Sequence, residues 1–296
     1  MALVATLIAN PSNPVLTSAL GEAAYNAVDG AGLYWLAGGV ACDIALKDGT
    51  DRATALAALK AAIGDQPVDA AVQEMDTRRK KILIADMDST MIGQECIDEL
   101  AAEVGLKDKV SAITARAMNG EIAFEPALRE RVALLAGLPV DVIGQVIDSR
   151  ITLTPGGREL VATMRANGGH AALVSGGFTA FTSVVAAMIG FDENHANVLE
   201  SANGKLTGTV REPILGKQAK VDALQAISAQ LGLNPSDAIA VGDGANDLGM
   251  LELAGSGVAL HAKPSVAAQA DIRIDHGDLT ALLYLQGYRK SDFVTP

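Results

Sequence analysis

The chain has 296 residues, of which 49% are hydrophobic and 20% charged, so it can build a packed core and is not disordered as a whole. Its 23 basic and 35 acidic residues give a formal net charge of −12, and only 3% of the residues are aromatic. This balance excludes a basic nucleic-acid-binding surface and a polybasic membrane surface, so we expect neither nucleic acid nor membrane as a partner.

The amino terminus and the cysteines favour a cytoplasmic location. Met1 to Asn10 is apolar but lacks the basic region of a signal peptide. No apolar run reaches the ~18 residues that a membrane-spanning helix needs. Cys42 and Cys96 are too few for a disulfide framework and do not have metal-ligand spacing, so we expect both to be buried small apolar residues.

Residues 1–76 predict a small α+β domain. Short apolar runs at 3–9, 32–37, 40–46 and 68–72 indicate strands, and helical spacing marks 16–28 and 51–63. Asp51 is placed to cap the second helix, and two glycines between the second and third runs predict a hairpin. The order β-α-β-β-α-β is that of a split βαβ, ferredoxin-like unit.

A charged linker at 77–81 leads into a second domain at 82–296. Apolar runs at 82–85, 171–174, 238–241 and 258–260 predict buried parallel strands, and helical segments such as 158–166 and 220–231 lie between them. This alternation predicts an α/β fold with a Rossmann-like, doubly wound parallel sheet. The nearly all-helical stretch at about 91–150 predicts a cap over the carboxyl ends of the strands.

Polar clusters follow these strands, at the sheet edge where this fold binds ligands. Asp86 and Asp88 follow the first run, Ser175 and Gly176 the second, and Asp243 the third, while Lys220 opens a helix. One carboxylate of the first pair can act as a nucleophile and the other as a general acid and base. Hydroxyl, glycine amides and lysine can hold phosphate oxygens. The combination indicates phosphoryl transfer.

Three carboxylates in one site would repel each other without a hard cation between them. Asp86, Asp88 and Asp243 are therefore candidate ligands of Mg²⁺, which takes oxygen ligands and also accepts substrate phosphate. Each residue also has a plain structural interpretation. The first two can cap a loop, Ser175 and its glycines can form an ordinary turn, and Lys220 can be a surface lysine.

These residues stand in motifs that resemble a known family. From about Lys81 to Ile274 the chain is similar to the phosphoserine phosphatases of the haloacid dehalogenase (HAD) superfamily. The similarity rests on four strings: Asp86-Met87-Asp88-Ser89-Thr90 followed by Glu95, Phe124 to Val132 with Arg131, Val174-Ser175-Gly176-Gly177-Phe178, and Val241 to Asp247.

The resemblance implies a role for each matched position. Asp86 would be the nucleophile and a Mg²⁺ ligand, Asp88 the general acid and base with its backbone carbonyl on the metal, and Asp243 the third ligand, with Asp247 supporting the metal shell. Further matched positions bind substrate: Ser175, Gly176 and Lys220 at the phosphate, Asn246 beside it, and Glu95 and Arg131 at the ammonium and carboxylate. Met118 and Phe124 fall in the family's mobile cap segment.

The implied activity is Mg²⁺-dependent hydrolysis of O-phosphoserine, the last step of phosphorylated serine biosynthesis. Two alternatives stay open: a related phosphatase or phosphotransferase acting on another small phosphoester, and a catalytically idle amino-acid-sensing module. For Arg131 a surface ion pair with Glu125 or Glu130 is the alternative. The first eighty residues resemble ACT-type regulatory domains, which bind amino acids, but a domain that forms a homodimer explains them equally well.

Overall fold

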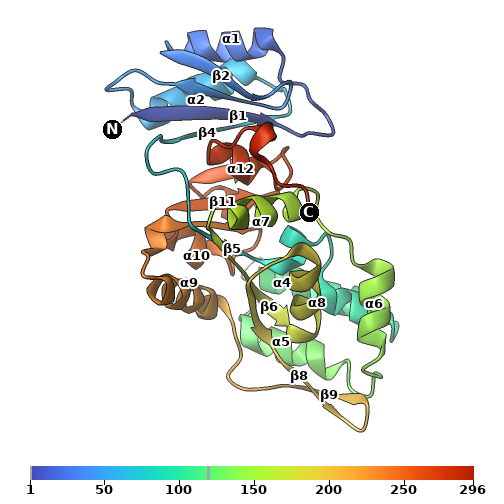
Figure 1. The fold of residues 1–296 in the computed structure, drawn as a ribbon. Helices are drawn as coiled ribbons and strands as arrows, with labels where there is room; N and C mark the ends of the chain where they lie inside the picture. Colours follow the sequence, from blue (N-terminus) through green and yellow to red (C-terminus); the bar gives the residue numbers. More distant parts are fainter. Residues whose placement is uncertain (1, 119–120) are drawn as a thin grey trace.

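The computed structural model describes residues 2–118 and 121–296 and contains a small N-terminal sheet and a larger parallel sheet (Figure 1). The elements of the N-terminal unit are β1 (Leu3–Ala9), α1 (Ser18–Ala27), β2 (Gly32–Ala37), β3 (Ala41–Ala45), α2 (Arg52–Ile63) and β4 (Val68–Glu74). The strands pair antiparallel in the order β2-β3-β1-β4. This confirms the predicted split βαβ topology.

Local sequence explains how these elements begin and which way they face. The Asp51 carboxylate accepts the backbone N–H of Thr54 at 2.8 Å and caps α2 as predicted. Along β1, Leu7 belongs to the apolar core beneath the two helices, whereas Ile8 belongs to the core on the opposite face of the sheet. This alternation follows from the period of two in a strand, and both faces of the sheet are therefore buried.

The larger unit is built on six strands in the order β12-β11-β10-β5-β6-β7. Every neighbouring pair is parallel. The strands are β5 (Ile82–Ala85), β6 (His170–Phe178), β7 (Glu193–Asn197), β10 (Ala238–Gly242), β11 (Ser256–Leu260) and β12 (Ile272–Ile274). The sheet confirms the predicted doubly wound α/β fold.

Helices cover both faces of this sheet. Leu83 packs in the core with the α7 and α8 side, and its neighbour Ile84 packs in the core with α9 and α10. The helix α9 begins at Lys217, so Lys220 lies in its first turn and does not open it. The helices are α7 (Gly157–Ala166), α8 (Thr179–Ile189), α9 (Lys217–Leu231), α10 (Leu248–Leu253), α11 (Pro264–Ala267), α12 (Ala281–Leu285), η2 (Pro235–Asp237) and η3 (Lys290–Asp292).

The cap follows the first strand of the large sheet and occupies the lower right of Figure 1. A hairpin from later in the chain, between β7 and α9, joins the cap, and the sequence analysis did not predict it. The backbone N–H of Leu206 in this hairpin donates to Leu138 O at 2.8 Å, and Gly137 N–H donates back to Leu206 O at 2.8 Å. The cap elements are η1 (Met87–Met91), α3 (Cys96–Ala102), α4 (Lys107–Met118), α5 (Phe124–Ala133), α6 (Val142–Arg150), β8 (Leu199–Ala202) and β9 (Lys205–Val210).

The two units meet through the face of the N-terminal sheet that its own helices leave uncovered. Ile8 and Ala71 on this face belong to the same apolar core as Leu282 and Tyr284 of α12. Figure 1 shows α12 lying directly against the sheet. Among the described residues, none of the helices has the length and apolar content that crossing a bilayer requires.

Candidate active site

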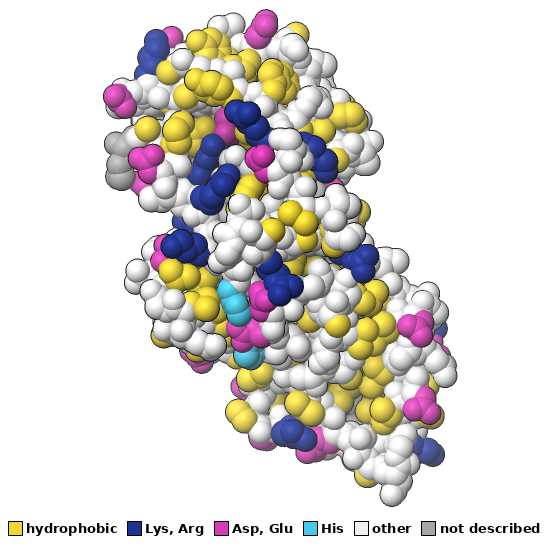
Figure 2. Space-filling view, viewed as in Figure 1, with side chains coloured by type: hydrophobic (Ala, Val, Ile, Leu, Met, Phe, Trp, Pro, Cys, Tyr) yellow, Lys and Arg dark blue, Asp and Glu magenta, His cyan; other side chains and the backbone are white. Residues whose placement is uncertain are grey.

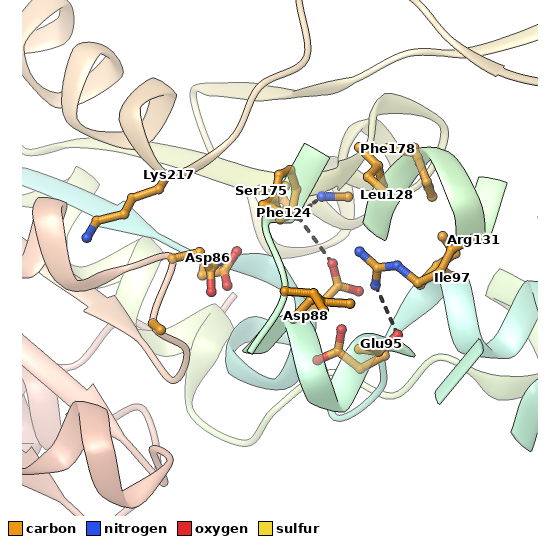
Figure 3. Close-up of a pocket in the computed structure, with 17 residues that line it drawn as sticks. Asp86, Asp88, Glu95, Ile97, Phe124, Leu128, Arg131, Ser175, Phe178 and Lys217 are labelled. Carbon is orange, nitrogen blue, oxygen red and sulfur yellow. Dashed lines mark hydrogen bonds between the residues drawn. The ribbon is translucent and has the colours of Figure 1, made fainter. Parts of the chain in front are cut away.

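Three neighbouring strands bring the predicted polar clusters to one edge of the large sheet. Asp86 follows β5, Ser175 lies near the end of β6, and Asp243 follows β10. Because β5 stands between the other two strands and all three are parallel, these side chains converge. A cavity of about 310 Å³ opens there beneath the cap (Figure 3). Seven predicted residues line it: Asp86, Asp88, Glu95, Arg131, Ser175, Gly176 and Asn246.

Lys220 lies beside the cavity, held between two carboxylates. Its Nζ is 2.7 Å from Asp86 Oδ1 and 2.6 Å from Asp247 Oδ1, and the side chain is only 2% exposed. The interpretation of Lys220 as a surface lysine is therefore wrong. Its ammonium and the Met87 N–H, at 2.8 Å, both engage Asp86 Oδ1. This arrangement fixes the carboxylate and leaves Oδ2 as the oxygen available for chemistry.

Asp86, Asp243 and Asp247 form a buried acidic group whose oxygens lie within 4.8 Å of one another. The Oδ1 atom of Asp243 is buried and has no hydrogen-bond partner among the described residues. Leaving such an atom without a partner is costly, and a cation bound there would remove that cost. The side chain of Asp247 thus joins this group, whereas that of Asp88, predicted as a ligand, is directed elsewhere.

The protonation equilibria show how crowded this negative charge is. Burial, followed by the charge of Asp247, raises the pKa of Asp86 well above its ordinary value, although Lys220 opposes the shift. The same two causes raise the pKa of Asp243 to about 6. Burial disfavours the ammonium of Lys220, but Asp247 and Asp86 outweigh it and raise the pKa of the lysine. Lys220 and, at 3.6 Å from Asp243 Oδ2, Lys263 supply two positive charges for three carboxylates, so the group can hold a metal ion.

Asp88 is oriented by hydrogen bonds from two sides. Cys96 N–H donates to its Oδ1 at 2.8 Å, and the Ser175 hydroxyl donates to its Oδ2 at 3.2 Å. Desolvation raises the pKa of Asp88, which makes its protonated form more available at neutral pH. Figure 3 shows Asp88 between Asp86 on one side and Arg131 on the other. The carboxyl group is thus placed between the two ends of the cavity.

A close approach of two segments explains why Gly176 has no side chain. A Cβ built on Gly176 would lie 2.9 Å from the ring of Phe124, so any larger residue would push this cap aromatic away. Asn197, buried at the end of β7, donates its side-chain amide to Gly176 O at 2.9 Å and to Leu215 O at 3.0 Å. Asn197 therefore joins the loop at Gly176 to the segment before α9, a contact that the sequence analysis missed.

Glu95 and Arg131 lie at the cap end of the cavity. Arg131 is 5% exposed, so its interpretation as a surface ion pair is wrong. Its Nη1 donates to the Thr114 hydroxyl at 2.9 Å and its Nε to Ala127 O at 3.1 Å. Burial lowers the pKa of Arg131, with Glu95 and Asp98 opposing. The Ser89 hydroxyl donates to Glu95 Oε1 at 2.7 Å. Burial, followed by the charge of Asp88, raises the pKa of Glu95 well above its ordinary value.

The site belongs to a recognisable protein family. The family model of haloacid dehalogenase-like hydrolases matches residues 83–252. A probable phosphoserine phosphatase from Schizosaccharomyces pombe is 48% identical over 211 residues, which cover 71% of this chain and 70% of the relative. The chain belongs to the phosphoserine phosphatase family of these hydrolases. Matches to further phosphoserine phosphatases cover between 58% and 94% of the relative's length.

Two solved structures resemble this phosphoserine phosphatase family member over nearly its whole length. A HAD family hydrolase from Salmonella enterica serovar Typhi superposes with a TM-score of 0.84 at 29% identity, covering 96% of this chain and 98% of the other. A probable phosphoserine phosphatase from Vibrio cholerae superposes with a TM-score of 0.77 at 33% identity, covering 98% and 88%. In both, the similarity includes the N-terminal unit as well as the larger one.

The cap also supplies lining residues to this family member that the sequence analysis did not single out. They come from three cap helices and from the segment between α4 and α5, and they give the cavity a mainly apolar wall beside Arg131. These residues are Ile97, Thr114, Ala117, Ile122 and Leu128. Met118, at the end of α4, was predicted to lie in the mobile segment of the cap, and its side chain is outside the described part of the chain.

Proposed function

We propose that this protein hydrolyses O-phosphoserine to serine and phosphate through an aspartyl-phosphate on Asp86. One observation supports this most strongly: a single cavity has Asp86, which Lys220 fixes from beside the cavity, at one end and the buried Arg131 and Glu95 at the other. The first end fits a phosphate ester. The second offers a guanidinium for a carboxylate and a carboxylate for an ammonium.

In the first half of the reaction, Asp86 Oδ2 attacks the phosphorus atom of the ester. The P–O bond to the serine oxygen breaks, and this oxygen takes the proton of the Asp88 carboxyl group. Lys220 stays beside the Asp86 carboxylate throughout and offsets negative charge on the transferring group. We propose that Ser175 and Gly176 bind the phosphate oxygens, although in this structure the Ser175 hydroxyl donates to Asp88 Oδ2 at 3.2 Å and the Gly177 N–H donates to Ser175 Oγ at 2.8 Å.

In the second half, Asp88 is a carboxylate and takes a proton from a water molecule. The water oxygen attacks the phosphorus of the aspartyl-phosphate, the bond to Asp86 breaks, and phosphate leaves. Asp86 and Asp88 thereby return to their starting states. Cys96 N–H and Ser175 hold Asp88 in one orientation, which suits a group that serves both as acid and as base.

The residues present fit Mg²⁺. Buried carboxylate oxygens, one of them without a partner, are the hard ligands this ion prefers. We propose that Asp86 and Asp243 hold it through their side chains, Asp88 through its backbone carbonyl, and Asp247 as support next to Lys220. When bound, the ion supplies positive charge that lowers repulsion between these carboxylates and the substrate phosphate.

The proposed division of the chain is an ACT-like domain at 1–76, a linker at 77–81 and a HAD-like domain at 82–296. The gap between the last strand of one sheet, which ends at Glu74, and the first strand of the other, which starts at Ile82, supports this division. Three further expectations stay predictions: a homodimer through the N-terminal domain, an amino-acid regulator and a cytoplasmic location.

Phosphate release from a set of phosphorylated compounds tests the proposal. O-phosphoserine, O-phosphothreonine and p-nitrophenyl phosphate are assayed with Mg²⁺ and again with excess chelator. We expect the highest kcat/KM for O-phosphoserine, loss of all activity with chelator, and recovery when Mg²⁺ is added back. Equal kcat/KM values for the three compounds would show a general phosphatase and contradict the assignment of O-phosphoserine as substrate. Activity that persists with excess chelator would contradict the metal assignment.

A further inference from the structure

A second cavity lies where the N-terminal unit meets the large sheet, away from the candidate active site. It has a volume of about 250 Å³ and is mainly polar. Gly255 and Ser256 reach it from the start of β11, and Ile272 from the start of β12, so it lies at the amino edge of the parallel sheet. The candidate active site lies at the carboxyl edge, and a molecule bound here is therefore not the one being hydrolysed.

Three positive side chains from two segments line this cavity. Arg52 comes from the first turn of α2, and Arg78 and Lys80 come from the linker. Two acidic residues, Glu74 and Asp271, also line it. Figure 2 shows Lys and Arg side chains gathered at the waist between the two units. The lining thus has three positive and two negative side chains, and one of the positive ones, Arg78, is also paired with Asp43, in a chain whose net charge is −12.

The cations of this cavity retain donors that the protein itself does not use. Arg78 Nη2 is 2.8 Å from Asp43 Oδ2, but its Nη1 is buried and has no hydrogen-bond partner among the described residues. Lys80 Nζ donates to Ser236 O at 2.8 Å, which leaves the other N–H groups of its ammonium. Arg52 is exposed and forms no ion pair with any residue that the structure describes.

We propose that this cavity is a binding site for a small oxyanion, either inorganic phosphate or the carboxylate of an amino acid. The exposed guanidinium of Arg52 and the ammonium of Lys80 are groups that recognise such an anion, and Arg78, whose buried Nη1 lacks a partner among the described residues, lies beside them. The bound anion contacts α2, the linker and the amino edge of the large sheet together. It therefore holds the N-terminal unit against the larger one.

Hydrogen–deuterium exchange of the full-length protein locates the binding. The probes are inorganic phosphate and, separately, serine, each compared with the same concentration of chloride. We expect slower exchange in peptides covering residues 73–80 and 254–257 with at least one probe. Which probe protects them distinguishes phosphate from an amino-acid carboxylate. Slower exchange limited to peptides around Asp86, Ser175 and Asp243 with both probes would overturn the proposal.

Charge reversal at Arg52 separates the cavity from the candidate active site. Arg52 is exposed and outside the catalytic machinery, so Arg52→Glu is expected to fold and to keep its basal activity. We expect this variant to need an about tenfold higher concentration of the probe for the same protection of the 73–80 peptide. Lys60→Glu, at the other end of α2 and outside the cavity, is the matched control and should behave like the wild type. Unchanged protection in the Arg52→Glu variant would mean that the anion binds at another site and would contradict the proposal.

Discussion

Asp69 on β4 accepts the backbone N–H of Gly277, 208 residues later in the chain, at 2.8 Å. The same carboxylate accepts Asp275 N–H at 2.8 Å and His276 N–H at 3.1 Å. Gly277 O in turn lies 2.8 Å from His261 Nε2, and His261 is two residues before Lys263, whose Nζ is 3.6 Å from Asp243 Oδ2. One buried side chain of the N-terminal unit thereby orders a turn of the larger unit that contacts the segment next to the active site.

We expect Asp69→Ala to lower the free energy of unfolding by about 1–3 kcal/mol, because three backbone N–H groups would lose their acceptor. Chemical denaturation of the variant and the wild type measures this difference. Asp65→Ala, an exposed aspartate in the turn before β4, is the control and should change stability by less than about 0.5 kcal/mol. Equal stabilities of the two variants would show that the Asp69 contacts contribute nothing.

A chain reduced to residues 82–296 should keep Mg²⁺-dependent phosphatase activity, since no proposed catalytic residue precedes Asp86. It should also be less stable, because the apolar face around Leu282 and Tyr284 loses the sheet that covers it. Specific activity at low temperature and a thermal unfolding curve test the two expectations separately. A folded but inactive truncated chain would show that the chemistry depends on the N-terminal unit.

Asp86→Asn should abolish turnover, because an amide is too poor a nucleophile to attack phosphorus. The variant also removes one of the two carboxylates that pair with Lys220. Asp88→Asn should retain the nucleophile and lower kcat by about 10²–10⁴-fold, the range for loss of a general acid and base. Acid quenching during turnover of the wild type, followed by peptide mass spectrometry, should find phosphate on Asp86. Phosphate on Ser89, Thr90 or Ser175 would contradict the assigned roles.

Arg131→Ala should lower kcat/KM for O-phosphoserine by about 30- to 5,000-fold, equivalent to the ~2–5 kcal/mol cost of removing one partner of a buried charge pair. The activity on p-nitrophenyl phosphate, which has no carboxylate, should fall far less. Glu95→Gln should likewise lower kcat/KM for O-phosphoserine more than for p-nitrophenyl phosphate, because it removes the carboxylate that faces the substrate ammonium. An equal fall in kcat/KM on both substrates would mean that neither residue recognises the serine part of the substrate.

Thr114 is expected to position Arg131 without touching the reacting atoms. Its hydroxyl accepts the hydrogen bond from Arg131 Nη1 at 2.9 Å and donates to Asp98 Oδ1 at 2.8 Å. Thr114→Val should raise KM for O-phosphoserine with little change in kcat, lowering kcat/KM by about 5- to 30-fold for the ~1–2 kcal/mol involved. Thr114→Ser, which keeps the hydroxyl, should restore it. A fall in kcat on both substrates would point instead to a general loss of structure.

Most of the fold was predictable because its signals are local. Ile82–Ala85 is apolar in every position, as a strand buried on both faces must be, and Asp51 stands directly before an apolar helical pattern. The hairpin of β8 and β9 gave no such signal. Its strands are short and largely polar, and its pairing with Leu138 joins segments far apart in the sequence.

The predicted site residues do come together, but their partners could not be foreseen. That Arg131 is buried depends on Thr114 and Ala127 lying beside it, which only the packing of α4 against α5 determines. Asn197 was not predicted because a single asparagine at the end of a short polar strand is common in any sequence. Its contacts with Gly176 and Leu215 exist only once β7 lies next to β6.

The cavity draws its two ends from different parts of the chain. Asp86, Lys220 and Asp243 stand on the sheet and its helices, whereas Arg131 and Thr114 stand on the cap inserted after the first strand. If the proposed roles hold, substitutions in that insert should exchange one phosphate ester for another while the proposed nucleophile and its lysine stay in place. For an engineer, the cap is the region to randomise when a new substrate is wanted, and the strand ends are the region to leave alone.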